Sequence, residues 1–439
     1  MMTPAIVVIA YNRPDSLKRV LDSLKKASYP EGVNPTLVIS LDKCDTDDTV
    51  KVAREFEWTF GEKRVVEHPE RLGLKKHVLS CGEFAKEYGS IIVLEDDLYV
   101  SPAFYEYSCK ALDFTKDDDK IGGVSLYNHL FNVHVREAFC AIDDGYDNWY
   151  FQLASSWGQA YTENQWNSFI SWYSQNEALD MKANPFIPEN VSGWSDKSWL
   201  KYYIAYLIET DKYFFYPRVS FTTNFGDVGS HIDKPDTDLQ VPLFGGRGPL
   251  YCKFSTLDNS QAVYDAFFEN TKLGYLSDAI RESTNPGITI CDLYGYKPVE
   301  KMIEVVKSQP SNDSIKNGEG VVRILSSQVL PYKIEKSYAR QMRPVDANIV
   351  YDVPGCDYFL YNTEPVNDIN ADGKKNITAE NNNCGKKDKA GDEITALNKD
   401  KSLSQKRAER WFYQYRGISA AQMKDMLLYR IKEATRRIK

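Results

Sequence analysis

The chain has 439 residues, of which 42% are hydrophobic, 26% charged and 13% aromatic, and its formal net charge is −8. This length can bury one large core or two moderate ones, and the composition excludes collagen-like and low-complexity classes for the whole chain. The negative charge argues against a nucleic-acid partner, because nucleic-acid-binding proteins neutralise phosphates with Lys and Arg. No run of about 18 apolar residues is present, so we predict neither a transmembrane helix nor a signal peptide.

The cysteines are far apart in the sequence. The eight cysteines form no CxxC pair and no compact spacing pattern. This predicts neither a zinc site nor a disulfide framework. A reducing cytosol is the simplest environment for such a chain, so we expect a cytoplasmic protein.

Strand and helix patterns alternate in the N-terminal part of the chain. Continuous apolar runs predict buried strands at residues 5–10, 36–40 and 91–94, and residues 64–67 are a shorter strand candidate. Between them, helical spacing follows the first run as far as Leu24, and residues 50–60 predict a second helix. Strands that are apolar on both faces and separated by helices indicate an α/β fold, with a Rossmann-like, mostly parallel sheet and helices on both faces.

The amino-acid composition and the pattern of predicted elements change along the chain. The α/β pattern occupies residues 1–120, and Tyr- and Trp-rich segments with polar loops occupy 121–300. The tryptophans there either build a second core or stack on sugar rings, and both interpretations stay open. Residues 301–365 predict a C-terminal extension. Residues 366–404 have few large apolar side chains and cannot offset the entropy of ordering, so we expect a flexible linker.

Residues 405–439 predict a basic amphipathic helix. From Lys401 onward, eleven Lys and Arg stand against three Asp and Glu, a balance of +8 that leaves −16 for the rest of the chain. Met423, Met426 and Leu427 begin an apolar stripe at helical spacing. Such a helix lies on an anionic membrane surface or docks on protein, and the sequence leaves both alternatives open.

Three consecutive acids follow the predicted strand 91–94. Glu95, Asp96 and Asp97 fall at the carboxyl end of that strand, which is where open α/β sheets bind ligands. Adjacent carboxylates repel each other unless a cation lies among them, and oxygen ligands suit Mg²⁺ or Mn²⁺. The cluster therefore predicts a divalent-metal site, with a solvated acidic turn as the alternative.

Two more polar side chains follow neighbouring strands. Arg13 comes shortly after the first strand and Asp42 shortly after the second, so both are expected at the same sheet edge as the acids. Arg13 can pair with a phosphate, and Asp42 can accept a hydrogen bond from a base N–H. Neither GxGxxG nor GxxxxGK[ST] is present, which disfavours a dinucleotide dehydrogenase and a P-loop NTPase.

Several sequence blocks resemble GT-A fold nucleotide-sugar glycosyltransferases, and among them the inverting alpha-mannoside beta-1,2-N-acetylglucosaminyltransferase family. The likeness covers roughly residues 5–235 in the family's order. Its blocks are residues 6–14 (IVVIAYNRP), 39–42 (ISLD), 93–107 (VLEDDLYVSPAFYEY), 156–162 (SWGQAYT), 193–199 (GWSDKSW) and 224–231 (NFGDVGSH).

The resemblance implies roles for the acids. Asp97 matches the last acid of the family's EDD motif and would coordinate Mn²⁺, or Mg²⁺, on the donor diphosphate. Asp96 and Glu95 would contact ribose, donor sugar or metal-bound water.

The resemblance also implies a nucleotide pocket and a loop. Arg13 and Asp42 match positions that line the uridine pocket, and His77 falls where a uracil-contacting histidine is expected. For His77 the alternative is an exposed histidine on a basic helix. Residues 224–233 are expected to close over the donor, with His231 against the diphosphate, and an ordinary surface loop is the alternative.

Asp196 is the expected catalytic base. An inverting transfer needs one carboxylate to take the proton of the acceptor hydroxyl. Trp194 and Trp199 flank Asp196, so we expect apolar walls to raise its pKa. Because Ser195 stands where the family has a second acid, two other bases, Asp227 and Asp233, stay open.

The resemblance thus predicts a metal-dependent, inverting glycosyltransferase that moves a sugar, N-acetylglucosamine or a related hexose, from a UDP-sugar to a glycan acceptor. A bacterial enzyme of surface polysaccharide or lipooligosaccharide synthesis fits best, with a lipid-linked acceptor. Such an enzyme would be cytoplasmic, with peripheral contact to the inner face of the cell membrane through residues 405–439. The alternatives are a carbohydrate-binding protein that has lost transfer and a nucleotidyltransferase.

Overall fold

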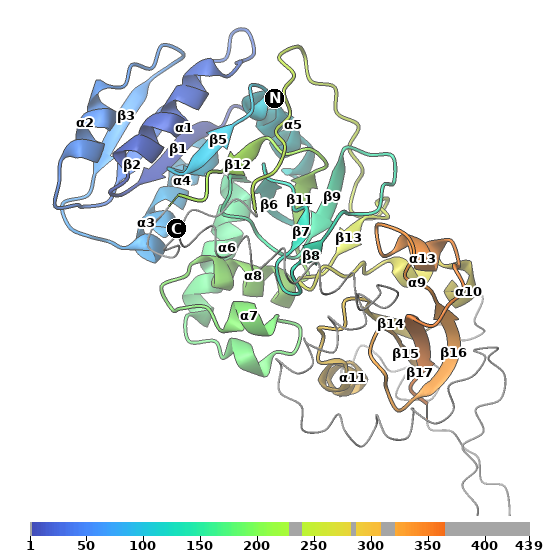
Figure 1. Cartoon of the computed structure of the whole chain (residues 1–439). Helices are drawn as coiled ribbons and strands as arrows, with labels where there is room; N and C mark the ends of the chain where they lie inside the picture. The colour runs from blue at the N-terminus through green and yellow to red at the C-terminus, as the bar shows by residue number, and fades with distance from the viewer. Residues whose placement is uncertain (1, 228–238, 282–286, 309–320, 365–439) are drawn as a thin grey trace, which may run out of the picture. The chain divides into compact units, whose positions relative to one another are not determined.

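The structure is a computed structural model, and it describes residues 2–227, 239–281, 287–308 and 321–364 (Figure 1). All of these residues belong to one unit, Met1–Asn367. The predicted linker 366–404 and the predicted basic helix 405–439 lie outside the described residues, and so do His231 and Asp233.

A nine-stranded sheet forms the centre of this unit. Its strand order is β13-β9-β11-β6-β10-β4-β1-β2-β3. In chain order the strands are β1 (Ala5–Ala10), β2 (Leu37–Leu41), β3 (Lys63–Glu67), β4 (Ser90–Glu95), β6 (Ile121–Ser125), β9 (Asn148–Phe151), β10 (Gln159–Thr162), β11 (Tyr213–Pro217) and β13 (Val263–Tyr264). Neighbours pair in parallel except around β10 and between β9 and β11. The four strands predicted in the N-terminal part of the chain correspond to β1 to β4.

Helices cover both faces of the sheet. Ile6 and Val8 of β1 belong to a buried cluster that includes residues of α1 and α5, whereas Val7 belongs to a second cluster that includes residues of α3, α6 and α8. The helices are α1 (Pro14–Lys26), α2 (Asp48–Glu55), α3 (Leu74–Gly82), α4 (Phe84–Tyr88), α5 (Phe104–Thr115), α6 (Glu163–Asn176), α7 (Glu189–Ser192) and α8 (Leu200–Glu209), with a 3-10 turn at Met181–Ala183. The predicted α/β fold with helices on both faces is therefore confirmed.

Helix α1 shows how the local sequence builds this layer. Pro14 occupies the first turn, where its missing N–H costs no hydrogen bond. Leu17, Val20, Leu21 and Leu24 are fully buried against the sheet, and each contributes about 2 kcal/mol of hydrophobic stabilisation. The helix thereby holds the turn that carries Arg13 at the end of β1.

The second predicted helix is shorter than expected. Helix α2 ends at Glu55, whereas the helical pattern suggested residues 50–60. Phe56, Trp58 and Phe60 instead form an aromatic group, with ring centroids of Trp58 and Phe60 5.0 Å apart. Burial of these rings in an irregular segment prevails over helix propensity.

A second, four-stranded sheet follows, in the order β14-β15-β17-β16. It comprises β14 (Gly287–Asp292), β15 (Val321–Ser326), β16 (Lys333–Tyr338) and β17 (Tyr358–Asn362), with α9 (Leu273–Leu276), α10 (Asp278–Arg281), α11 (Val299–Ser308) and α13 (Ala347–Val350). Because β14 pairs with β15, this sheet takes in residues ahead of the expected boundary at 301. Short strands complete the fold: β5 (Leu98–Val100) with β12 (Thr222–Asn224), and β7 (Phe131–Asn132) with β8 (Glu137–Ala138).

The structure bears on two expectations from the sequence, that no helix spans a membrane and that the cysteines are reduced. None of the helices in the described ranges is both long and apolar enough to span a membrane. Cys356 is disulfide-bonded, which departs from the expectation of a fully reduced chain. The free cysteines are Cys44, Cys81, Cys109, Cys140, Cys252 and Cys291.

Candidate active site

A cavity of about 530 Å³ opens at the carboxyl ends of β1, β2 and β4, and we call it the strand-end cavity. Side chains from all three strand ends meet there, as is usual for ligand sites of open α/β sheets. Of the residues singled out in the sequence, the structure brings together around it Arg13, Asp42, His77, Glu95, Asp96, Asp97 and Asp227.

Arg13 lies among the acids that follow β4. Its guanidinium forms an ion pair with Asp96 and a second one with Asp97, whose Oδ2 is 3.1 Å from Nη1. The family resemblance implied that Arg13 lines the uridine pocket, and in the structure the guanidinium is a cation among the acids. Burial lowers the pKa of Arg13, but Asp96 and Asp97 outweigh it and raise the pKa above its usual value.

The three acids differ in their surroundings. Burial raises the pKa of Glu95, and the nearby Asp97 and Asp96 raise it further. Burial raises the pKa of Asp96 to about 6, although Arg13 opposes this shift. Asp97 Oδ1 is buried and has no hydrogen-bond partner. An unpartnered buried carboxylate oxygen is costly, so this atom is a natural ligand for a cation.

The site fits a divalent metal only in part through protein ligands. No three Asp, Glu, His or Cys side chains converge as a metal-binding group within the part of the chain that the structure describes. Asp97 Oδ1 would therefore hold the ion together with ligands from a bound molecule, such as diphosphate oxygens.

Asp42 is buried and anchors the turn ahead of α3. Its carboxylate accepts backbone N–H bonds from Leu72 at 2.7 Å, Gly73 at 2.9 Å and Lys43 at 2.9 Å. Gly73 has a φ of 74°, a backbone conformation that favours glycine. Asp42 thus shapes the rim of the strand-end cavity.

His77 is buried on the cavity side of α3, so the alternative of an exposed histidine is wrong. Its Nε2 lies 2.8 Å from Ser40 Oγ, and its ring meets that of His68 edge to face. Burial lowers the pKa of His77 to about 4, although the nearby Asp42 opposes this. His77 is therefore neutral at physiological pH and offers a ring nitrogen for hydrogen bonding.

Asp196 differs from the expectation. Its side chain is 92% exposed and does not line the cavity, although the neighbouring Ser195 and Ser198 do. Asp196 Oδ1 lies 2.6 Å from Lys201 Nζ, and the hydrogen bond from Lys201 lowers the pKa of the carboxyl group. The prediction that apolar walls raise this pKa is wrong, because the Trp194 and Trp199 rings line the cavity instead of enclosing Asp196.

Asp227, the alternative base inside the described residues, lies on the cavity wall. Ser16 Oγ donates a hydrogen bond to it at 2.7 Å, and Arg19 forms an ion pair with it. Burial raises the pKa of Asp227, but the bonds from Arg19 and Ser16 outweigh this and lower it. The Phe225 N–H also donates to Asp97 O at 3.0 Å, so this segment packs directly on the acidic turn.

Sequence patterns missed part of the cavity lining. Arg71 lies with its guanidinium carbon 4.8 Å from the centroid of the Tyr11 ring, and both side chains line the cavity. Lys201, the buried partner of Asp196, was also missed. Tyr11 directly follows β1, which is a signal that could have found it, whereas nothing near Arg71 in the sequence marks it. Of the tryptophans, Trp149 and Trp166 belong to the core and Trp157, Trp194 and Trp199 line the cavity.

Comparisons with known proteins agree with an activity on sugars. Residues 5–137 match the family model of glycosyl transferase family 2, and this range contains β1 to β4 with Arg13 and the acidic turn. A comparison with curated proteins finds no match.

Solved structures give distant similarities. One is the mannosyltransferase PcManGT from Pyrobaculum calidifontis in complex with GDP-Man and Mn²⁺, with 16% identity, 37% of this chain and 46% of that chain covered, and a TM-score of 0.28. Another is S. aureus TarS 1-349 in complex with UDP-GlcNAc, with 15% identity, 52% and 60% covered, and a TM-score of 0.35. The chain thus spans about half of the length of these proteins. What the family model supports is glycosyl transfer as a class of activity for the N-terminal part of this chain.

Proposed function

We propose that the protein is a metal-dependent, inverting glycosyltransferase that transfers a hexose, such as N-acetylglucosamine, from a UDP-sugar to a glycan acceptor. The observation that carries the proposal is the unpartnered, buried Oδ1 of Asp97, a residue that lines the strand-end cavity and lies inside the family match. Residues 1–120 would bind the nucleotide-sugar, and residues 121–300 would bind the acceptor.

The chain's own residues divide the work of donor binding. Asp97 would hold a Mn²⁺ or Mg²⁺ ion, which stabilises the negative charge that develops on the leaving UDP. Neutral His77 would hydrogen-bond to the uracil, and Asp42 keeps the neighbouring turn in place. Glu95 and Asp96 would accept hydrogen bonds from ribose or sugar hydroxyls.

A carboxylate next to the strand-end cavity would remove the proton of the acceptor hydroxyl group. We keep Asp196 as the proposed base, because it is ionised at neutral pH and lies next to the cavity residues Ser195 and Ser198. Lys201 orients it through the 2.6 Å contact. The acceptor hydroxyl attacks C1 of the donor from the face opposite UDP while Asp196 takes its proton, which gives a β-linked product from an α-linked donor.

Asp227 is the competing base. It lines the cavity itself, but Ser16 and Arg19 already occupy its carboxylate. Replacing each aspartate by Asn in turn therefore separates the two assignments.

The test is a donor screen with Mn²⁺, in which UDP release and the mass of a defined oligosaccharide acceptor are followed together. We expect one UDP-sugar to release UDP and to add one hexose mass, with loss of both signals in EDTA. Pyrophosphate release would identify a nucleotidyltransferase. Glycan binding without turnover of any donor would identify a carbohydrate-binding protein. Either result would overturn the proposal.

The biological setting is part of the same proposal. We infer a role in bacterial surface polysaccharide or lipooligosaccharide synthesis at the inner face of the cell membrane, with residues 405–439 as the contact to an anionic surface. Co-sedimentation with anionic vesicles, compared between the full chain and a chain that ends at residue 404, tests this. Equal co-sedimentation of the two would end the membrane proposal.

A further inference from the structure

A second, larger cavity lies where the central sheet meets the four-stranded sheet, and we call it the junction cavity. It has a volume of about 830 Å³, within the range of small-molecule sites, which are common at such junctions. It shares no lining residue with the strand-end cavity.

The junction cavity lies at the opposite edge of the central sheet. Strand β11 runs in the same direction as β4, since β6 and β4 both pair antiparallel with β10 and β11 is parallel to β6. Tyr213 begins β11 and lines the junction cavity, whereas Glu95 ends β4 and lines the strand-end cavity. The two cavities therefore serve different ends of the strands.

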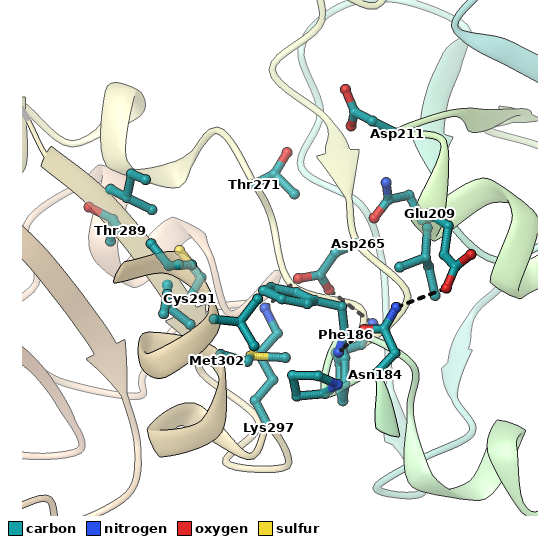
Figure 2. Close-up of a pocket in the computed structure, with 18 of the residues that line it drawn as sticks. Asn184, Phe186, Glu209, Asp211, Asp265, Thr271, Thr289, Cys291, Lys297 and Met302 are labelled. Atoms are coloured by element: carbon teal, nitrogen blue, oxygen red, sulfur yellow. Dashed lines mark hydrogen bonds and ion pairs between the residues drawn. The ribbon is translucent and has the colours of Figure 1, made fainter. Parts of the chain in front are cut away.

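The two walls of the junction cavity differ in polarity. The wall from β14 and α11 is mostly apolar, and the Phe186 and Phe267 rings pack with it, whereas the facing wall carries amide and carboxylate groups. Figure 2 shows Cys291 and Met302 on one side and Asn184 and Glu209 on the other. The apolar wall consists of Ile288, Ile290, Met302, Val305 and Val306.

Asn184 organises the polar wall through two hydrogen bonds. Asn184 Oδ1 accepts the Phe186 N–H at 2.9 Å, and its Nδ2 donates to Glu209 Oε1 at 3.5 Å (Figure 2). Asn184 thereby connects the backbone of Phe186 to the Glu209 carboxylate. Glu209 is exposed, so its oxygens can accept further hydrogen bonds.

The charges in the junction cavity exclude an anionic ligand. Lys297 is its one lining cation among the described residues, and this side chain is already paired with Asp265. Glu209 and Asp211 add two more carboxylates, of which Asp211 is paired with Lys120 from outside the lining. A phosphate or a uronic acid would meet an excess of negative charge here.

We propose that the junction cavity binds a neutral oligosaccharide. A pyranose ring has an apolar C–H face and a rim of hydroxyls, which matches an aromatic and aliphatic wall opposite a carboxylate and amides. Phe186 stacks on a sugar ring, and Glu209 accepts hydroxyl hydrogen bonds from it. That this saccharide is a distal part of the acceptor chain rests on the proposed function.

The experiment titrates the full chain by calorimetry with three probes: cellotetraose, tetra-N-acetylchitotetraose and, as the anionic probe, tetragalacturonate. We expect a neutral probe to bind and tetragalacturonate to bind more weakly. Phe186→Leu keeps an apolar side chain but removes the flat ring, so we expect it to raise the Kd by about fivefold. Glu209→Gln is expected to raise it by a smaller factor.

Two control variants test whether the saccharide binds in the junction cavity. Tyr251 is 90% exposed and lines neither cavity, so Tyr251→Ala should leave the Kd unchanged. Asp97→Asn disables the strand-end cavity and should also leave it unchanged, so a failure of sugar transfer is distinguishable from a failure of saccharide binding. No binding of either neutral probe, equal binding of tetragalacturonate, or a Kd that responds to Asp97→Asn and not to Phe186→Leu would overturn the proposal.

Discussion

The two cavities differ in whether their buried polar groups have hydrogen-bond or ion-pair partners. In the strand-end cavity Asp97 Oδ1 is left without a partner, and the acids beside it have raised pKa values. In the junction cavity the buried Lys297 is paired with Asp265. Uncompensated polar groups are costly and persist where chemistry needs them, whereas satisfied ones shape a surface. This difference agrees with the two proposals, reaction chemistry in the strand-end cavity and saccharide recognition in the junction cavity.

The largest effect is expected from replacing Asp97, the residue that carries the unpartnered oxygen. Asp97→Asn replaces a charged metal ligand by a weak neutral one, and we expect turnover to fall by about 10³-fold or more because the leaving diphosphate loses its cation. UDP release measures turnover, and Mn²⁺-dependent binding of UDP measures the metal site. The unfolding free energy should change little, because the loss of like-charge repulsion with Glu95 and Asp96 offsets the loss of the ion pair with Arg13. Unimpaired turnover would remove the basis of the assigned chemistry.

The second prediction concerns the base. Asp196→Asn should lower kcat by about 10²-fold or more and leave the KM for the donor unchanged, because the lost proton acceptor acts only in the reaction. Since Lys201 lowers the pKa of Asp196, the loss of kcat that protonation of Asp196 causes should lie below the usual range of an aspartate.

The matched variant is Asp227→Asn, whose carboxylate is tied to Ser16 and Arg19. We expect the smaller loss of kcat from it. A larger loss from Asp227→Asn than from Asp196→Asn would transfer the role of base to Asp227.

The sequence predicted the fold and the gathering of strand ends better than it predicted side-chain partners. Apolar runs in the sequence mark strands β1, β2 and β4, and the polar residues that follow these strands meet at one edge because parallel strands share their carboxyl ends. Pairing of Arg13 with Asp96 and exposure of Asp196 depend on how distant segments meet, which no local pattern encodes.

The junction cavity was out of reach of the sequence for the same reason. Its lining extends from Gln152 to Val306, and no motif or periodicity connects these positions. The acids of the strand-end cavity, by contrast, are consecutive in the chain. Consecutive functional residues can be found by pattern, and residues collected by folding cannot.

A third prediction tests whether the buried acid near the junction is structural. Asp346 accepts hydrogen bonds from Tyr264 Oη and from Asn270 Nδ2, and burial raises its pKa to about 6. The folded state binds the proton of Asp346 more tightly than the unfolded state does. The protonated carboxyl group therefore contributes its full stabilisation below the pKa of the unfolded state, about 4, and this stabilisation is lost as the pH rises through the folded-state pKa of about 6.

Urea unfolding at pH 4 and pH 7 measures this contribution. For Asp346→Asn, which stays neutral, we expect the difference in unfolding free energy between the two pH values to be smaller than in the wild type by about 2 to 3 kcal/mol. The double variant Asp346→Asn with Tyr264→Phe should show no further pH effect. An unchanged difference would mean that Asp346 is already ionised in the folded protein.

The smallest expected effect concerns the cation that the chain supplies by itself. Arg13 neutralises Asp96 and Asp97 at close range, so it competes with a divalent ion for the same carboxylates. Removing the guanidinium in Arg13→Ala should therefore tighten binding of Mn²⁺ alone by about tenfold. Arg71→Ala removes the same charge from the same cavity, but Arg71 stacks on Tyr11 and should change the Kd by much less. Electron paramagnetic resonance of free Mn²⁺ measures the Kd of both variants and needs no turnover. If the two variants behaved alike, general electrostatics would explain the change, and if Arg13→Ala weakened Mn²⁺ binding, Arg13 would be a residue that orients Asp97 for the metal.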